Sequence, residues 1–403
     1  MITKAKCPFT PADVDYDESR LEELDAHFQR LMKKGWIQSA NYTLSRNGKV
    51  FANTAIDKQS FEESDNRELK PDVIRGIASI TKIFTATALF KLFEDGYIRP
   101  NQPVCEIMPE FEKAPFNGIT IAHLLTHTSG LYPDGGCFPY YYTEPWSFVD
   151  ETKEGENWVE NSLKSGMYNK PGKEWAYCSF GFVLLGEIIS RVSTMRAEAF
   201  IRKVILDPCG MSSSFFKYEF INGFIPDDTA RNWAERLYIQ DEDDKKSISK
   251  LADYHFGKPV GNKEFNVWDS VPATGGGLFS CTEDLNRFGR MLINNGYADD
   301  GKRVIGRKAI DRMTENYTTP DILDNCWGAG GVYRMYALGP DTRRTADSHF
   351  SKGSFFHEGA GACSLLMDPQ EKMVASWFVP WADGGWHAEA LYNASAVMWS
   401  GLK

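Results

Sequence analysis

The residues best suited to chemistry are Ser79 and Lys82, within RGIASITKIFTATALFKLFEDGY at residues 75–97. The apolar spacing of this stretch predicts a helix, and Asp95-Gly96 is a suitable C-terminal cap. Side chains three positions apart share a helix face, so the hydroxyl and the amine can meet. A serine becomes a nucleophile when a base takes its proton, and a lysine serves as that base where its ammonium is destabilised. Free N–H groups at the helix start would also suit a developing oxyanion.

The S-x-x-K spacing by itself is a weak signal. It recurs at Ser214–Lys217, Ser247–Lys250 and Ser400–Lys403, none of which opens a long apolar helix, so we interpret these three as chance. For Ser79 the alternative is a serine at a helix start with a lysine that extends its amine to solvent. The rest of the chain must decide between these two interpretations.

The elements around this helix are predicted from periodicity and turn residues. Residues 18–35 have the apolar spacing of an amphipathic helix, and residues 39–56 form a hairpin around Asn47-Gly48, a type I′ turn signal. Helices are also predicted over residues 177–193 and 282–296. Near the end, residues 354–380 are predicted as two strands joined by the turn DPQEK.

Strands therefore lie near both ends of the chain and helices lie between them. A shared sheet would satisfy the strand edges, which predicts an α+β protein with an antiparallel sheet flanked by helices and an inserted helical lobe. We expect one domain over residues 1–403. Its α/β lobe spans about residues 15–95 plus 300–403, and its mostly helical lobe spans about residues 96–299. The charged stretch DEDDKKSISK at residues 241–250 is predicted to be a solvated loop.

Five segments in order resemble the serine β-lactamase-like superfamily, in its branch of class C β-lactamases, DD-peptidases and esterases. The segments are ASITKIFTATAL, ITIAHLLTHTSGL, PGKEWAYCSFGFVLLGEII, ATGGGLFSCTEDLNRFGRML and FFHEGAGACSLLMDP. The first resembles the nucleophile helix, the third the Y-x-N motif, and the fifth the late K-T-G or H-x-G motif. The resemblance runs from about residue 40 to the C-terminus and implies the β-lactamase/transpeptidase-like fold.

The resemblance also implies a role for each matching residue. Ser79 would be the acylated nucleophile and Lys82 would share its proton. Tyr177 would act as general base and acid, as a phenolate stabilised by nearby cations, and His357 would supply a donor near it. The N–H groups of Ser79 and Ala360 would form an oxyanion hole. Gly359 would let the strand approach the substrate closely.

Two positions depart from the usual pattern of the superfamily. The second motif is Tyr177-Cys178-Ser179, so Ser179 stands where most members have a substrate-facing asparagine, which leaves simple esters open and puts amides in doubt. Glu358 follows His357 in the third motif and would repel the carboxylate of a β-lactam. A histidine is also usually neutral near pH 7, unlike the lysine of other members. We therefore expect weak β-lactamase activity at most.

The expected function is a serine hydrolase that forms an acyl-enzyme on a small ester, or on a D-amino-acid or peptide amide. One alternative is an acyltransferase that uses the same Ser-Lys-Tyr site. Another is a binding or sensor protein that is acylated without turnover. The chemistry requires no cofactor, and a small acyl compound is the expected partner. Oligomeric state, acyl group and leaving group stay open.

Composition and single residues narrow the partners further. The net charge of −10 disfavours nucleic acids, and no apolar run is long enough to span a membrane. Eight scattered cysteines and the lack of a secretory signal at the N-terminus predict reduced thiols in a cytoplasmic protein. His123 and His127 have metal-like spacing, but we predict packed or capping histidines and no metal site. The aromatic stretches at residues 137–148 and 376–387 are candidate walls of a substrate cleft.

Overall fold

The computed structural model describes residues 1–221, 225–246, 265–346, 348–381 and 388–403. The strands are β1 (Ile2–Lys4), β2 (Ala40–Arg46), β3 (Lys49–Ile56), β4 (Arg75–Gly76), β5 (Phe215–Phe216), β6 (Leu278–Ser280), β7 (Leu323–Asp324), β8 (Val332–Tyr333), β9 (Phe355–Gly359), β10 (Cys363–Asp368) and β11 (Met373–Phe378). The α-helices are α1 (Ser19–Lys33), α2 (Thr81–Glu94), α3 (Ile121–Leu125), α4 (Pro145–Asp150), α5 (Trp158–Ser162), α6 (Ser179–Ser193), α7 (Ala197–Ile201), α8 (Lys217–Ile221), α9 (Asp227–Arg236), α11 (Thr282–Ile293), α12 (Arg307–Thr314) and α13 (Ala394–Trp399).

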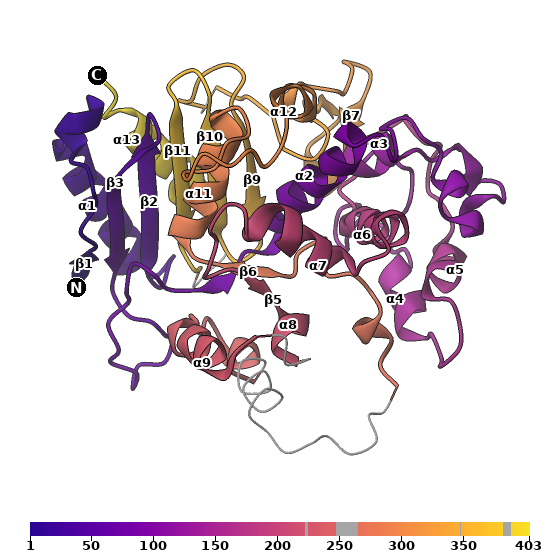
Figure 1. Cartoon of the computed structure of the whole chain (residues 1–403), viewed down its shortest axis with the longest axis horizontal. Helices are drawn as coiled ribbons and strands as arrows, with labels where there is room; N and C mark the ends of the chain where they lie inside the picture. Colours follow the sequence, from indigo (N-terminus) through magenta and orange to yellow (C-terminus); the bar gives the residue numbers. More distant parts are fainter. Residues whose placement is uncertain (222–224, 247–264, 347, 382–387) are drawn as a thin grey trace.

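The two ends of the chain share one sheet, which confirms the sequence-based prediction. Its six antiparallel strands run in the order β1-β3-β2-β11-β10-β9, so N-terminal and C-terminal strands meet where β2 pairs with β11 (Figure 1). The predicted hairpin joins β2 to β3. Asn47 and Gly48 have φ angles of 54° and 76°, the left-handed conformation that a type I′ turn requires at both positions.

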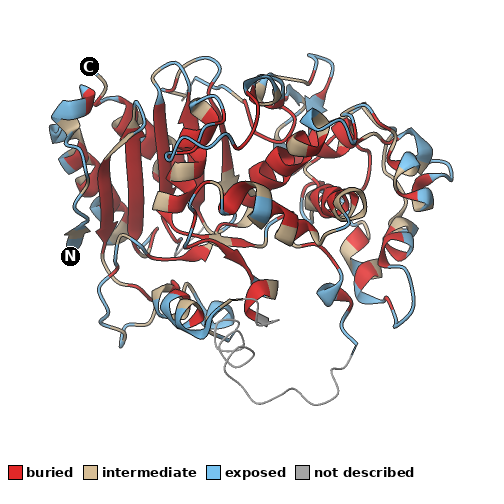
Figure 2. Cartoon of the chain, in the orientation of Figure 1, coloured by how far each residue is buried: buried red, intermediate tan, exposed pale blue. Residues whose placement is uncertain are grey.

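Each face of this sheet packs against a different set of helices. Alternate residues of a strand point to opposite faces. On β10 and β11, Leu365 and Val374 belong to the core that includes α2, α6 and α11, whereas Leu366 and Ala375 belong to the core shared with α1 and α13. Both faces are therefore buried, and the exposed residues gather on peripheral helices and loops (Figure 2).

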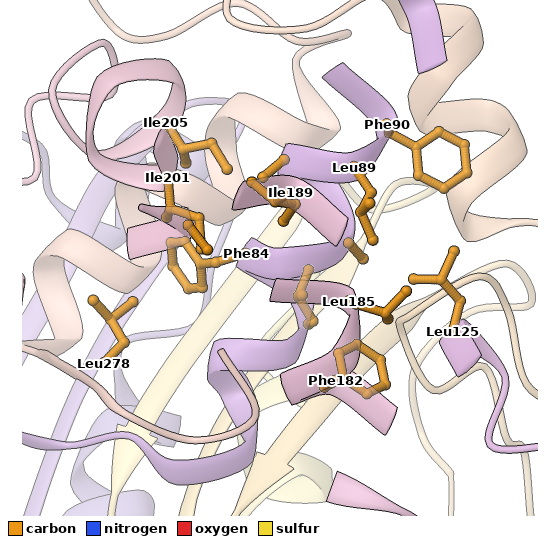
Figure 3. Packing of buried hydrophobic residues seen from close by; sticks show 14 of the residues in the cluster. Phe84, Leu89, Phe90, Leu125, Phe182, Leu185, Ile189, Ile201, Ile205 and Leu278 are labelled. Carbon is orange, nitrogen blue, oxygen red and sulfur yellow. The ribbon is translucent and has the colours of Figure 1, made fainter. Parts of the chain in front are cut away.

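The helix predicted around Lys82 lies at the centre of the larger core. A short 3₁₀ turn, η2 (Ala78–Ile80), precedes α2, which ends at Asp95 with Gly96 at a φ of 78°. Apolar residues of α2, α6 and α7 interlock around it (Figure 3). Because α2 is buried on nearly all sides, the side chain of Lys82 is fully buried, which excludes the alternative of an amine extended to the surface.

Two expectations about the elements need correction. Residues 354–380 form three strands rather than two, because Gly361 and Ala362, with φ angles of 76° and 63°, turn the chain between β9 and β10. In the charged stretch predicted as a loop, residues 242–246 are helical and residues 247–250 lie outside the described residues. The division into two lobes at about residues 96 and 299 stays a proposal. None of the helices in the described part of the chain combines the length and hydrophobicity of a membrane-spanning helix.

The expectation of fully reduced cysteines is wrong in this structure. Cys137 and Cys326 form a disulfide across 189 residues of sequence, with their Cα atoms 4.4 Å apart. The other six cysteines are free thiols. Sequence spacing gave no sign of this pair, because tertiary packing brings together the loop after α3 and the turn after β7.

Candidate active site

Ser79 lies at a strained turn between a short strand and the helix α2. Strand β4 pairs with β6, and the Ile77 N–H donates to the Leu278 carbonyl at 2.9 Å. Ala78 then has a φ of 43°, an unusual value for a residue other than glycine. This turn places Ser79 at the wall of a cavity of about 1410 Å³.

Lys82 is completely buried and its amine is directed at three oxygen atoms. Lys82 Nζ donates to Ser79 Oγ at 2.9 Å, to Ser179 Oγ at 3.1 Å and to the Gly275 carbonyl at 2.7 Å. Burial lowers the pKa of the Lys82 ammonium to about 8, because no bulk water solvates the charge. A fraction of Lys82 is therefore neutral near pH 7 and able to accept the proton of Ser79.

Tyr177 lies directly before α6 and beside both of these residues. Its ring centroid is 4.9 Å from Lys82 Nζ. Burial raises the pKa of the Tyr177 phenol, and the charge of Asp134 acts in the same direction, while a hydrogen bond with the Ser79 side chain opposes them. A phenolate requires a lowered pKa. The surroundings of Tyr177 therefore favour a neutral phenol that can donate its proton.

Ser179 is held by Asp134, a residue that the sequence analysis did not single out. The Ser179 N–H donates to Asp134 Oδ1 and the Ser179 hydroxyl donates to Asp134 Oδ2, each at 2.6 Å. Asp134 follows the segment ITIAHLLTHTSGL, where an Asp-Gly pair indicates only a turn. Because its partner is 45 residues away, no local pattern could have identified it.

His357 is brought close to Tyr177 by the strand β9. The two ring centroids are 6.4 Å apart. The His357 Nδ1–H donates to the Glu358 carbonyl at 2.7 Å, and the Tyr336 hydroxyl donates to Nε2 at 3.3 Å. Burial and the nearby Lys82 lower the pKa of His357 to about 4, so it is a neutral imidazole at physiological pH.

Glu358 has a partner that the sequence argument did not anticipate. Its carboxylate lies 3.7 Å from Arg343 Nη2, and the same guanidinium lies 3.8 Å from Asp341. The charge of Glu358 is therefore partly balanced, which weakens the expected repulsion of a substrate carboxylate. Neither Glu358 nor His357 is among the described residues that line the cavity.

The end of β9 approaches the nucleophile segment closely. A Cβ atom added to Gly359 would lie 2.3 Å from the Ile77 carbonyl oxygen and 2.4 Å from Cys363 Sγ. A larger residue would force β9 away from the turn that carries Ser79. The close approach at Gly359 is thus to the protein backbone, while the next residue, Ala360, lines the cavity together with Ser79.

Further buried polar residues lie around the aromatic residues Trp175 and Tyr177. Arg334 donates to Asp341 Oδ2 at 2.6 Å, and its guanidinium lies 4.3 Å from the Trp175 ring centroid. His127 accepts a hydrogen bond from the Cys178 N–H at 3.0 Å, and His123 accepts one from the Thr120 N–H at 3.1 Å. The two histidines are thus a packed and a capping residue, as the sequence analysis predicted. Arg334 was missed because nothing in its local sequence marks it.

The two aromatic stretches have different outcomes. Trp146 of residues 137–148 lines the cavity, whereas Phe138 is buried beside the disulfide. In the later stretch, Trp377 is buried in the core that the sheet shares with α1 and α13. It donates to the Ala390 carbonyl at 3.1 Å, so it does not form a cleft wall. Trp381 is not among the described cavity-lining residues, and Trp386 lies outside the described residues.

The cavity has two walls of different character. We call Ser79, Asp134, Ser179, Gly275 and Ala360 the serine wall. The ion-paired wall consists of Arg196, Glu198, Arg202, Glu219 and Trp268. On the second wall Arg196 Nε lies 2.9 Å from Glu198 Oε2, and Arg202 pairs with Glu219.

The sequence of the chain matches the profile of the family described as Beta-lactamase over residues 24–396. It is similar to "Protein flp" of Staphylococcus aureus strain MRSA252, with 27% identity over 280 residues, which covers 68% of this chain and 49% of that protein. The chain therefore spans about half the length of the first curated relatives it matches.

Solved structures share the fold. A novel penicillin-binding protein homolog from Caulobacter crescentus has a TM-score of 0.70 at 18% identity, with 100% of both chains covered. A family VIII carboxylesterase has a TM-score of 0.66 at 18% identity, with 94% of this chain and 98% of that chain covered. EstCE1, a hydrolase with promiscuous acyltransferase activity, has a TM-score of 0.69 at 15% identity, with 94% and 99% covered. At these identities the similarity is one of fold.

Proposed function

Since the chain belongs to the Beta-lactamase family, we propose that it is a serine hydrolase that forms an acyl-enzyme on Ser79. The observation that carries this proposal is the distance of 2.9 Å between Lys82 Nζ and Ser79 Oγ at the wall of a large cavity. Burial, which lowers the pKa of Lys82 to about 8, makes the amine a usable base near neutral pH. The family resemblance assigns the same two residues to nucleophile and proton acceptor.

The proposed acylation begins when neutral Lys82 takes the hydroxyl proton of Ser79. Ser79 Oγ then attacks the substrate carbonyl, and the N–H groups of Ser79 and Ala360 stabilise the oxyanion. The bond to the leaving group breaks as that group receives a proton from the Tyr177 phenol, and the Lys82 ammonium can return a proton to Tyr177. Water then hydrolyses the acyl-enzyme with Lys82 again as the base, which releases the acid and restores Ser79.

We propose esters as the favoured substrates, ahead of D-amino-acid or peptide amides. The Ser179 hydroxyl has one proton and donates it to Asp134, so it has no donor left for a substrate amide carbonyl. A phenol or alcohol also leaves more readily than an amine. The similarity in fold to a carboxylesterase is consistent with this preference. We expect β-lactamase activity to be weak.

The test is hydrolysis of p-nitrophenyl butyrate by the wild-type protein and by Ser79→Ala, with intact-mass detection of any adduct. Turnover should fall by at least about a thousandfold in Ser79→Ala. Ser400→Ala is the matched control, because Ser400 also precedes a lysine by three residues but bonds to the surface residue Arg20 at 2.8 Å. Turnover that survives in Ser79→Ala would contradict the proposal. A stable Ser79 adduct without turnover would instead support a binding or sensor role.

A second candidate function is acyl transfer from the same acyl-enzyme to an alcohol or amine. The cavity of about 1410 Å³ is larger than a small ester requires, so an acceptor could occupy the remaining space. The similarity in fold to EstCE1 is consistent with this candidate. Added benzyl alcohol should then yield benzyl butyrate in competition with butyrate. Formation of butyrate alone at high alcohol concentration would leave hydrolysis as the function.

A further inference from the structure

A continuous chain of hydrogen bonds links the nucleophile to a carboxylate. Lys82 Nζ donates to Ser79 Oγ at 2.9 Å and to Ser179 Oγ at 3.1 Å, and Ser179 Oγ donates to Asp134 Oδ2 at 2.6 Å. The Ser179 hydroxyl has one proton, so its directions are fixed: it accepts from Lys82 and donates to Asp134. Asp134 thereby determines which lone pairs of Ser179 face the amine.

Asp134 is held in place by more than its contacts with Ser179. Its N–H donates to the Tyr177 carbonyl at 2.9 Å, and its carbonyl accepts from the Tyr142 hydroxyl at 2.5 Å. The loop is anchored further by the disulfide of Cys137, whose N–H donates to the Asp134 carbonyl at 3.1 Å. The carboxylate is therefore fixed relative to the two motifs that supply Tyr177 and Ser179.

The other titratable groups near Lys82 are held neutral. Burial raises the pKa of the Cys178 thiol to about 12 and raises that of the Tyr177 phenol. Burial and the charge of Lys82 lower the pKa of His357 to about 4 and lower that of His127 well below its usual value. These groups come from the segment before α6, from β9 and from the residues after α3. Burial has the largest effect on the pKa of Lys82 and lowers it, and the charge of Asp134 is the larger of the two opposing effects. Cys178 acts in the same direction as Asp134, but only as a thiolate, which its raised pKa disfavours.

We propose that Asp134 is a positioning residue of this site, which acts through Ser179 to hold Lys82 against Ser79 and to stabilise the ammonium that forms during acylation. The proposal rests on the function proposed above. In that reaction the proton moves from Ser79 Oγ to Lys82 Nζ, so a fixed carboxylate lowers the energy of the state that has just received the proton. Asp134 and Ser179 thus act together to orient the Lys82 amine toward Ser79.

The test is the pH dependence of kcat/KM with p-nitrophenyl butyrate for the wild-type protein and Asp134→Asn. The wild-type rate should fall as the pH drops below about 8, where Lys82 becomes protonated. Loss of the Asp134 charge removes a cause that raises the pKa of Lys82. The acidic limb of the pH profile, the fall of kcat/KM toward low pH, should therefore move to lower pH by about one unit in Asp134→Asn. The plateau rate should fall by about tenfold, because the ammonium formed in the reaction loses its partner.

A double-mutant cycle tests whether the effect passes through Ser179. Ser179→Ala breaks the connection between Lys82 and Asp134, so it should lower the plateau rate on its own. The double variant Asp134→Asn/Ser179→Ala should be no slower than the slower single variant, because both substitutions remove one chain of contacts. Multiplicative losses would show that the two residues act independently and would overturn the connection through Ser179.

Glu144→Gln is the matched control, since Glu144 is a half-buried carboxylate in the same part of the chain whose charge is not among those that act on Lys82. It should leave the acidic limb unchanged. Thermal unfolding curves confirm that each variant is folded. Asp134→Ala is the second variant if Asp134→Asn does not fold. An unchanged limb in folded Asp134 variants would overturn this inference while the proposed function stands. Absence of activity in the wild-type protein, or activity that survives in Ser79→Ala, would overturn both the proposed function and this inference.

Discussion

The cations at the two walls of the cavity have opposite kinds of contacts. On the ion-paired wall, Arg196 and Arg202 each contact a carboxylate directly, Glu198 and Glu219. Behind the serine wall, Lys82 contacts the hydroxyls of Ser79 and Ser179 and the Gly275 carbonyl, and no described carboxylate lies within 4.0 Å of its amine. A direct ion pair stabilises the charged form, whereas contacts with neutral oxygens leave the cost of burial only partly compensated, by the more distant charge of Asp134. The difference teaches that Lys82 is arranged to lose its proton, while the arginines are arranged to stay charged.

The largest expected effect follows from removal of Lys82, the cation behind the serine wall. Lys82→Ala should lower kcat/KM for p-nitrophenyl butyrate by about a thousandfold or more, because no other described residue in contact with Ser79 Oγ can accept its proton near neutral pH. Lys91→Ala is the control on the same helix. The Lys91 amine lies near the other end of α2, where it pairs with Glu94 at 2.7 Å. Equal losses in the two variants would contradict the contrast between the walls.

A smaller effect, on stability rather than on the pH profile, is expected on the ion-paired wall. Glu198 is fully buried, pairs with Arg196 and accepts from the Ala273 N–H at 2.9 Å. Glu198→Ala should lower the free energy of unfolding by about 2 kcal/mol, as it leaves a cation and a buried N–H without their partner. Denaturant unfolding measures this, with Glu187→Ala, an i,i+4 partner of Arg191, as a control expected to lose about 0.5 kcal/mol. A shift of the acidic limb of the pH profile in Glu198→Ala would contradict this contrast between the two walls.

The smallest expected effect concerns substrate size. Trp268 lines the cavity, is 40% exposed, and donates from Nε1 to Asp150 at 2.9 Å. Trp268→Ala should lower kcat/KM by about tenfold for an ester with a large apolar acyl group, since about 1.4 kcal/mol of contact is lost, and by less than about twofold for an acetate. Parallel assays of p-nitrophenyl acetate and p-nitrophenyl phenylbutyrate measure the ratio. An unchanged ratio would place the acyl group on the serine wall alone.

Local sequence was sufficient for the parts of the fold that repeat within a few residues. The i,i+3 spacing predicted that Ser79 and Lys82 meet, and the Asn47-Gly48 turn predicted the first hairpin. The late strands were miscounted because Gly361 was not recognised as a turn residue. Contacts between distant loops left no local pattern, so Asp134, Arg334 and the disulfide could not be predicted.

Sequence alone determined that a serine and a lysine share one helix start, and that the two ends of the chain build one sheet. Those features depend on spacing along a regular element. Only the tertiary structure decided the electrostatics: burial lowers the pKa of Lys82 and raises that of Tyr177, and Arg343 partly balances Glu358. The physical reason is that ionisation depends on the water and charges within a few ångströms of a group, and at this site loops separated by tens to hundreds of residues supply them.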